Sequence, residues 1–203
     1  MNLGDQVVLT ARRPDGLRDR QAASYRPTQW HSATRRQRWA VETMAVAPGD
    51  LVLEIGSGRG VAVSLVAERL TTGKIVAIDR SATMARLTSE HNERHIRAGR
   101  VEVLCTGFES AEFPADHLTK IFTVNVNLFW LDAATQQIDR MRSALKPDGE
   151  LFVFGERPRS ASTMANLAAT ERALQAHGFD TVRKIVPHGR ERLLTCVIGT
   201  VAH

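Results

Sequence analysis

The sequence predicts an α/β fold: a doubly wound, Rossmann-like sheet of about seven strands, mostly parallel, with the last strand antiparallel in a C-terminal hairpin. Three observations support this. Short apolar runs alternate with stretches of helical periodicity, the pattern of strand–helix–strand crossovers. A glycine-rich turn follows the first apolar run and opens a helix. Finally, two strand-like segments near the end of the chain are only five residues apart, which favours an antiparallel hairpin.

The apolar runs set the expected strands, at 51–55, 74–79, 101–105, 120–126 and 150–155, with the hairpin strands at about 181–186 and 192–201. Helical periodicity places helices at 34–47, 61–70, 81–95, 132–145 and 162–177. Ser81 and Asp132 are suitable N-caps, and the run Lys146-Pro147-Asp148-Gly149 is typical of a turn. Ligands bind beyond the carboxyl ends of such strands, so we expect the site in the loops that follow 55, 79, 105 and 124.

The length of 203 residues fits a single core-forming domain. Positive charge is concentrated at one end: residues 1–40 hold eight basic and three acidic residues, whereas 41–203 hold 19 of each. We expect 1–33 to be a basic N-terminal arm, either flexible or a lid, and 34–203 to be the folded domain. Such an arm attracts nucleic acid or an acidic substrate, or is simply a solvated leader; the sequence leaves these alternatives open.

No segment approaches the roughly 18 apolar residues that cross a bilayer, and arginines interrupt the N-terminal region. We therefore expect a cytoplasmic protein without a membrane partner. The two cysteines, Cys105 and Cys196, lie in apolar strands and have the pattern of small buried side chains. No Cys-x-x-Cys motif is present, and we expect no metal.

Gly56, Gly58 and Gly60 allow a sharp backbone turn and close approach to a ligand, a feature shared by many nucleotide-binding folds. Their Gly-x-Gly-x-Gly spacing differs from the dinucleotide fingerprint, because Val61 stands where the third glycine of that motif would lie. Glu54, just before the turn, would repel a pyrophosphate and suits a cationic ligand. S-adenosylmethionine carries an ammonium and a sulfonium and has no phosphate.

Asp79 ends the second expected strand, 19 residues after Gly60. A carboxylate there can accept hydrogen bonds from both hydroxyls of a ribose. The alternative is an exposed carboxylate at a strand end. Ribose binding does not separate S-adenosylmethionine from a nicotinamide cofactor, because both contain adenosine.

The run 51–60 resembles the first motif of the class I S-adenosylmethionine-dependent methyltransferases, and Asp79 matches the acidic residue of that family after strand two. Residues 145–151 are similar to its turn before strand five, and the resemblance covers roughly 35–203. It implies an enzyme in which Glu54 and the glycines hold the methionine portion and Asp79 holds the ribose. The expected cofactor-binding residues are Glu54, Gly56, Ser57, Gly58, Gly60, Asp79, Arg80, Met84, Gly107, Phe108, Glu109 and Asn125.

The chain departs from the family pattern twice. After strand three, the family often has Gly-Asp, whose carboxylate reaches the adenine amino group, but here Phe108 follows Gly107. Glu109 or a backbone carbonyl can take that role, or Phe108 lines the adenine pocket. Before strand four, where the family commonly has an acidic residue, this chain has Thr119 and Lys120.

Methyl transfer from a sulfonium is a displacement with an activated leaving group, so alignment supplies much of the acceleration. A general base is needed only when the acceptor must lose a proton early, and no catalytic residue is assigned. The loop after the fourth strand is not of the Asn-Pro-Pro-Tyr type found in amide and adenine N-methyltransferases. Candidates to line the acceptor pocket are Tyr25, His31, Asn127 and Trp130, although residues 128–130 equally suit packing on the next helix.

The sequence therefore predicts a methyltransferase that moves the methyl group of S-adenosylmethionine to an O, N or C atom of a small molecule. Methylation of RNA or protein with help from the basic arm is an alternative, as is a non-catalytic module that binds S-adenosylmethionine. A nicotinamide-dependent oxidoreductase is less favoured, because of Glu54 and the glycine spacing. The oligomeric state is left open.

Overall fold

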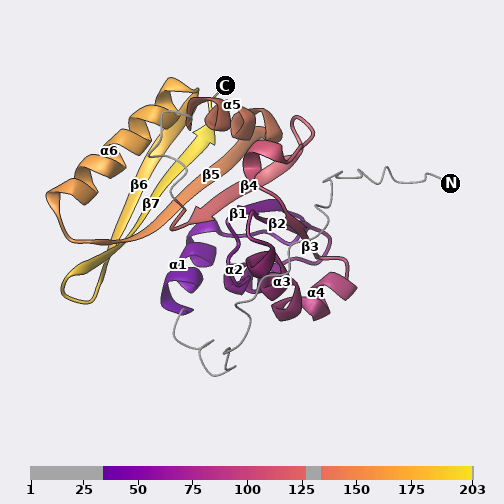
Figure 1. The fold of residues 1–203 in the computed structure, drawn as a ribbon. Helices are drawn as coiled ribbons and strands as arrows, with labels where there is room; N and C mark the ends of the chain where they lie inside the picture. The colour runs from indigo at the N-terminus through magenta and orange to yellow at the C-terminus, as the bar shows by residue number, and fades with distance from the viewer. Residues whose placement is uncertain (1–33, 127–133, 203) are drawn as a thin grey trace.

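The computed structural model describes residues 34–126 and 134–202. Seven strands form one sheet in the order β3-β2-β1-β4-β5-β7-β6 (Figure 1). All neighbours are parallel except β7, which runs antiparallel to both β5 and β6. The predicted fold class is confirmed. The strands are β1 (Leu51–Ile55), β2 (Lys74–Asp79), β3 (Val101–Cys105), β4 (Leu118–Val124), β5 (Leu145–Pro158), β6 (Phe179–His188) and β7 (Arg192–Val201).

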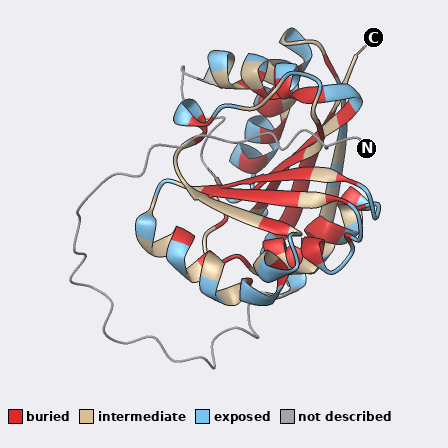
Figure 2. Ribbon diagram, turned by 90° about the vertical axis from the view of Figure 1, so that its right-hand side faces the viewer, coloured by how far each residue is buried: buried red, intermediate tan, exposed pale blue. Residues whose placement is uncertain are grey.

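Helices cover both faces of the sheet, and each face has its own apolar core. The helices are α1 (Thr34–Met44), α2 (Val61–Ala67), α3 (Ala82–His91), α4 (Glu93–Arg97), α5 (Ala134–Ala144) and α6 (Ala161–Ala176), with a short 3₁₀ helix, η2 (Phe108–Ser110). Helices α1 and α2 pack on one face and α5 and α6 on the other. Figure 2 shows the strands buried between the helices, whose outer surfaces are exposed.

Alternation along the strands decides which face each side chain meets, since successive residues of a strand point to opposite sides. Val52 of β1 and Phe122 of β4 join the core under α1 and α2. Leu53 and Ile121 join the core under α5 and α6. Glu54 shares the parity of Val52, so a carboxyl group leaves the first strand on the α1–α2 face.

The helix predicted over 81–95 is broken. It ends as α3 at His91, and α4 begins at Glu93, because Asn92 leaves helical geometry with φ −109° and ψ 16°. The Asn92 side chain donates to the carbonyls of Gly60 and Thr88, at 3.0 and 2.9 Å. A contact with a distant turn therefore overrides the local helical pattern. The predicted cap at Ser81 is confirmed, since its side chain accepts from Met84 N.

The turn predicted at 146–149 lies inside β5 rather than before it. Leu118 pairs with Leu145, but Lys120 already pairs with Glu150, so β5 carries extra residues that bulge out between these pairs. Asp148 has a left-handed φ of 62°, which is the turn-like feature that the sequence pattern detects. The other element boundaries shift by a few residues, and the cap predicted at Asp132 lies outside the described residues.

Within the described residues, no helix is both long and apolar enough to span a membrane.

Phe122 has no solvent exposure and stands on a central strand. Replacing it with alanine is expected to lower the free energy of unfolding by about 3–5 kcal/mol, the range for deleting a buried aromatic ring. Urea denaturation followed by circular dichroism measures this. Val182→Ala is the control, since Val182 is 60% exposed and should change stability by less than about 0.5 kcal/mol. Equal effects of the two substitutions would contradict this core assignment.

Candidate functional site

The glycine turn after β1 is built from three left-handed residues. Gly56, Gly58 and Gly60 have φ values of 75°, 55° and 73°, which glycine adopts without strain. The backbone N–H groups of Gly56 and Ser57 both donate to Ile78 O, at 2.9 and 3.1 Å. The turn is therefore tied to the carboxyl end of β2, beside the point where the strand order reverses between β1 and β4.

Helix α3 braces the turn from the side. Thr88 Oγ1 donates to Gly58 O at 2.9 Å and lies 3.2 Å from Ser57 Oγ, while Asn92 Nδ2 donates to Gly60 O. Both Thr88 and Asn92 are fully buried. Neither residue was predicted from the sequence to belong to the site. Their signal was a pair of polar side chains one helical turn apart, directed at the turn in a way that only the fold reveals.

Asp79 links the glycine turn to α3. Its two carboxylate oxygens accept from Gly58 N and from Ser81 N, each at 2.9 Å. These two bonds leave further lone pairs on both oxygens, because a carboxylate offers about four acceptor positions. The carboxylate thus holds the turn and keeps capacity for a ligand.

Glu54 lies beneath the turn and is only 3% exposed. Burial, and then the charge of Asp79, raise the pKa of the Glu54 carboxyl well above its ordinary value of 4.5. Its Oε2 atom is buried and has no hydrogen-bond partner in the protein. An unpartnered buried oxygen costs free energy that a donor or a cation brought by a ligand would recover. The site is therefore suited to a cation.

The loop after β3 places its two candidate side chains differently. The Phe108 ring is 2% exposed, stacks on Phe113 at a centroid distance of 5.9 Å, and has the Arg140 guanidinium 5.3 Å from its centre. This ring faces the core under α5 and α6. The exposed Glu109 instead folds its carboxylate over Gly107, where an added Cβ would lie 2.1 Å from Oε1.

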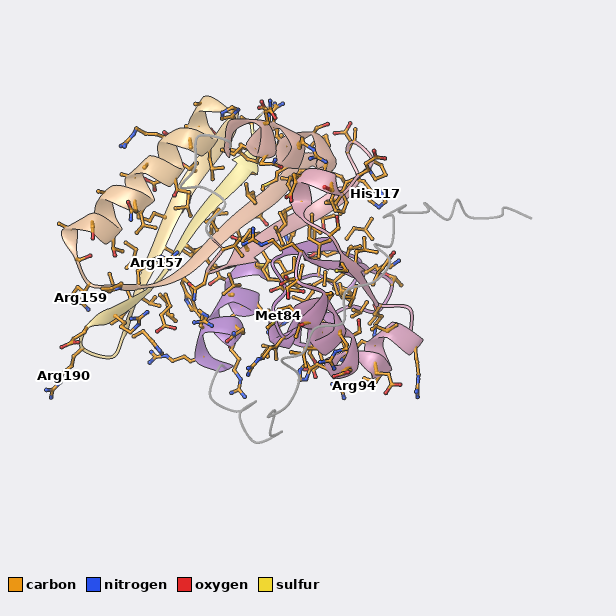
Figure 3. All side chains as sticks on the ribbon, viewed as in Figure 1. Met84, Arg94, His117, Arg157, Arg159 and Arg190 are labelled. Atoms are coloured by element: carbon orange, nitrogen blue, oxygen red, sulfur yellow. The ribbon has the colours of Figure 1, made fainter. Side chains whose placement is uncertain are left out.

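The remaining expected residues surround the same edge. Arg80 is exposed beside Asp79, and Met84 is half-buried on α3, where Figure 3 labels it. Asn125 directly follows β4 and has φ 59°; its N–H donates to Phe154 O, and its Oδ1 accepts from Glu156 N at 2.8 Å. It therefore joins the ends of β4 and β5. The predicted acceptor-lining residues lie outside the described residues: Tyr25, His31, Asn127 and Trp130.

Val126 connects the glycine turn to the opposite face of the sheet. Its Cγ2 methyl lies 2.6 Å from the position that a Cβ on Gly56 would take. The same side chain lines a cavity under α6. Val126 is thus a shared wall between the turn and that cavity.

His91 and His95 have the spacing of a metal-binding pair, although no metal was expected from the sequence. In the structure they fall on different helices, α3 and α4. Arg94 Nε donates to one ring nitrogen of His95, and Arg100 Nη2 lies 3.0 Å from the other. Burial, followed by the charges of Arg94 and Arg100, lowers the pKa of His95. Two guanidinium groups thus occupy the ring nitrogens that a metal would need.

Comparisons with known proteins find similarity to methyltransferases. Residues 52–149 match a family model described as a methyltransferase domain. An uncharacterized methyltransferase of Bacillus subtilis, YdaC, is 27% identical over 124 residues, which cover 61% of this chain and 65% of that protein. A ubiquinone/menaquinone biosynthesis C-methyltransferase of Hydrogenovibrio crunogenus is 26% identical over 119 residues, covering 58% of this chain and 46% of its own length.

Among solved structures, a SAM-dependent methyltransferase from Aquifex aeolicus superposes with a TM-score of 0.66 at 17% identity, covering 82% of this chain and 89% of that one. At that identity the likeness concerns the fold. The chain spans between about half and two thirds of the length of the two curated relatives.

Two glycines of the turn provide a matched test of its bracing. An added methyl at Gly60 would meet Asn92 Nδ2 at 2.5 Å and Thr88 Cγ2 at 2.8 Å, whereas one at Gly58 would meet nothing within 4 Å. Both alanine substitutions are expected to cost about 1–2 kcal/mol of left-handed strain. Gly60→Ala should cost about 1–3 kcal/mol more through overpacking. Thermal unfolding of the two variants measures the difference, and equal stabilities would rule out the proposed bracing by α3.

Proposed function

We propose that this protein, as a member of the class I S-adenosylmethionine-dependent methyltransferases, transfers a methyl group to a small molecule. The acceptor atom is O, N or C, and the reaction is an in-line displacement. The chain belongs to that family, and S-adenosylmethionine is its cofactor. The buried Glu54 carboxyl, with its unpartnered Oε2 beside three left-handed glycines, is the observation that carries the proposal.

The residues present fit the cofactor. A positively charged methionine portion belongs against Glu54, because the ammonium or sulfonium would give the buried oxygen its missing partner. The backbone at Gly58 leaves open space on the side where a side chain would project. Asp79 has spare acceptor capacity for the ribose hydroxyls. Around the adenosine we place Ser57, Arg80, Met84, Gly107 and Glu109, with Phe108 fixing the loop from the core side and Asn125 at the acceptor end.

When bound, the cofactor would supply a methyl group attached to a positively charged sulfur, and transfer of that methyl group would leave a neutral thioether. The chain's own contribution is alignment. Glu54 and the glycine turn hold the donor end, the turn itself is held by Asp79 and α3, and Val126 forms the side of the turn that faces α6. Fixing donor and acceptor in line is worth effective molarities of about 10⁵–10⁸ M in favourable cases. No side chain is assigned as a general base.

Two further expectations stay proposals. These are that residues 1–33 form a basic N-terminal arm or lid, and that the protein works in the cytoplasm. Methylation of RNA or protein is the alternative that the basic arm favours, and a non-catalytic cofactor-binding module is another. A nicotinamide oxidoreductase is disfavoured, because Glu54 would oppose a pyrophosphate.

Calorimetry with the full chain is expected to show S-adenosylmethionine binding in the micromolar range, and Asp79→Ala should weaken it. With tritium-labelled methyl donor and a small-molecule fraction of cell extract, label should appear in a low-mass product. Absence of binding would sink the proposal. Binding without turnover would favour the non-catalytic module, and label retained on RNA or protein would favour the alternative.

Glu54→Gln separates binding from stability. The neutral amide keeps the shape but loses the charge, so affinity for S-adenosylmethionine should fall about tenfold or more, the scale of one hydrogen bond to a charged group. The ligand-free variant should nevertheless be more stable than the parent at neutral pH, because it no longer buries an ionisable carboxyl. Calorimetry and thermal unfolding of both proteins measure the two effects. A variant that loses both stability and affinity would contradict this role for Glu54.

The sign of the pH dependence follows from the raised pKa of Glu54. The folded protein keeps a proton that the unfolded chain releases above about pH 4.5, so this contribution to stability is complete below that pH and is lost as pH rises through the folded pKa. Cofactor affinity should move oppositely, rising with pH as the carboxyl ionises to meet the cation. Calorimetry and thermal unfolding of the parent and of the Glu54→Gln variant should be repeated from about pH 5 to pH 7. The fall in stability and the rise in cofactor affinity with pH should appear only in the parent.

A further inference from the structure

The edge of the sheet that carries the glycine turn is divided by charge. Around the ends of β1, β2 and β3 stand the carboxyl groups of Glu54, Asp79 and Glu109. Around the end of β5, the start of α1 and the tip of the β6–β7 hairpin stand arginines. We call these the arginine surface: Arg35, Arg36, Arg157, Arg159, Arg190 and Arg192. Figure 3 shows Arg157, Arg159 and Arg190 on the side of the molecule away from Arg94.

Hydrogen bonds hold the three segments of this surface together. Arg159 N donates to Glu191 O at 2.7 Å, and Arg35 Nη2 donates to Pro187 O at 3.4 Å. Glu156 binds two of the guanidinium groups, at 2.8 Å from Arg36 and 2.6 Å from Arg192. The arrangement is therefore fixed by the fold, although its parts are more than 100 residues apart in the chain.

The arginines outnumber the acidic groups among them. The segments 34–36, 156–160 and 187–192 contain six arginines and two glutamates, Glu156 and Glu191, which is a formal charge balance of +4. Burial acts to raise the pKa of Glu156, but Arg192 and Arg36 outweigh it and lower that pKa, so this glutamate stays ionised at neutral pH. Even with Glu156 as a fixed anion, positive charge is left for a ligand.

A cavity lies between this surface and Val126, the residue that separates it from the glycine turn. It lies beneath α6 and is lined on one side by Val126, whose methyl packs on Gly56, and on another by Arg157 of β5. Polar groups of Thr163, Asn166 and Thr170 also line it. Along β5, Val153, Gly155 and Arg157 share the face toward α6, so strand alternation turns the arginine to the cavity.

We propose that the methyl acceptor carries a phosphate or carboxylate group, which the arginine surface binds while the rest of the acceptor lies beside Val126. This inference rests on the proposed function. Guanidinium groups match both anions through paired, charge-assisted hydrogen bonds. The cationic methyl donor would then bind at the acidic part of the edge, and the anionic acceptor at the arginine surface. The electrostatic field of the protein guides each reactant to the part of opposite charge.

The same surface is less suited to single-stranded nucleic acid. Such binding normally adds aromatic side chains on which bases stack. The described segments that form the surface, 34–36, 156–160 and 187–192, contain no Phe, Tyr or Trp. The lack of stacking side chains in these segments favours a small acceptor over a polynucleotide.

The test is to titrate the full chain with inorganic pyrophosphate, citrate and a 20-residue single-stranded RNA, in the presence of S-adenosylmethionine. The variant is Arg159→Gln with Arg190→Gln, two exposed positions. The matched control is Arg69→Gln with Arg97→Gln, which removes equal charge from exposed positions on the α2–α4 side of the molecule. Pyrophosphate or citrate binding should weaken about fivefold or more in the variant, the scale of one exposed ion pair, and less than twofold in the control.

S-adenosylmethionine binding, measured separately, should be unchanged in both double variants. If the parent fails to bind it, the proposed function fails, and the anion titrations still report on the surface. If it binds but neither anion does, or if variant and control lose equally, the acceptor inference is overturned. RNA that binds far more tightly than either small anion, with a steep salt dependence, also overturns it. As a positive readout, tritiated product from extract should be retained on an anion-exchange resin.

Discussion

The glycine turn has left-handed backbone geometry at every second residue from 56 to 60, and such a turn is not stable without contacts from the rest of the protein. Glycine removes the steric penalty at Gly56, Gly58 and Gly60, but it also leaves the unfolded chain with the greatest freedom to lose. The native turn therefore depends on bonds from outside it, from the end of β2 through Ile78 O and Asp79, and from α3 through Thr88. The break between α3 and α4 follows from the same requirement, because Asn92 serves the turn instead of continuing the helix.

The stability of the buried central strands explains how a buried carboxyl is tolerated next to the turn. Glu54 is costly in the ligand-free protein, since its Oε2 lacks a partner and Asp79 adds a second negative group nearby. The central strands around it, with Phe122 and Val52 fully buried, provide the stability that offsets this cost. A desolvated carboxyl that is retained at such a cost is typical of positions kept for binding rather than for folding. When a cationic ligand binds, the buried Glu54 carboxylate contributes a favourable interaction where it was a free-energy cost in the ligand-free protein.

The features predictable from sequence are those whose cause is local. The glycine spacing, the carboxylates of Glu54 and Asp79, and the alternation of strands and helices lie within short stretches of chain. The structure accordingly has the left-handed turn and the mostly parallel sheet with an antiparallel last strand. The bracing by Thr88 and Asn92 was not predictable, because it depends on which face of α3 meets the turn. Nor was the placement of the Phe108 ring, which is decided by Phe113 and Arg140 from other segments.

The division of charge along the edge has a topological origin. Parallel strands bring the ends of β1, β2 and β4 to one edge, and the long β5 extends to the same edge, where Arg157 and Arg159 follow Glu156. Because β7 is antiparallel, its beginning at Arg192, and not its end, lies there beside β5. A parallel seventh strand would bring its apolar end, near Val201, to this edge instead. The reversed strand therefore does more than complete the sheet: it places the arginines of the hairpin tip beside the end of β5, on the edge where we propose that the acceptor binds.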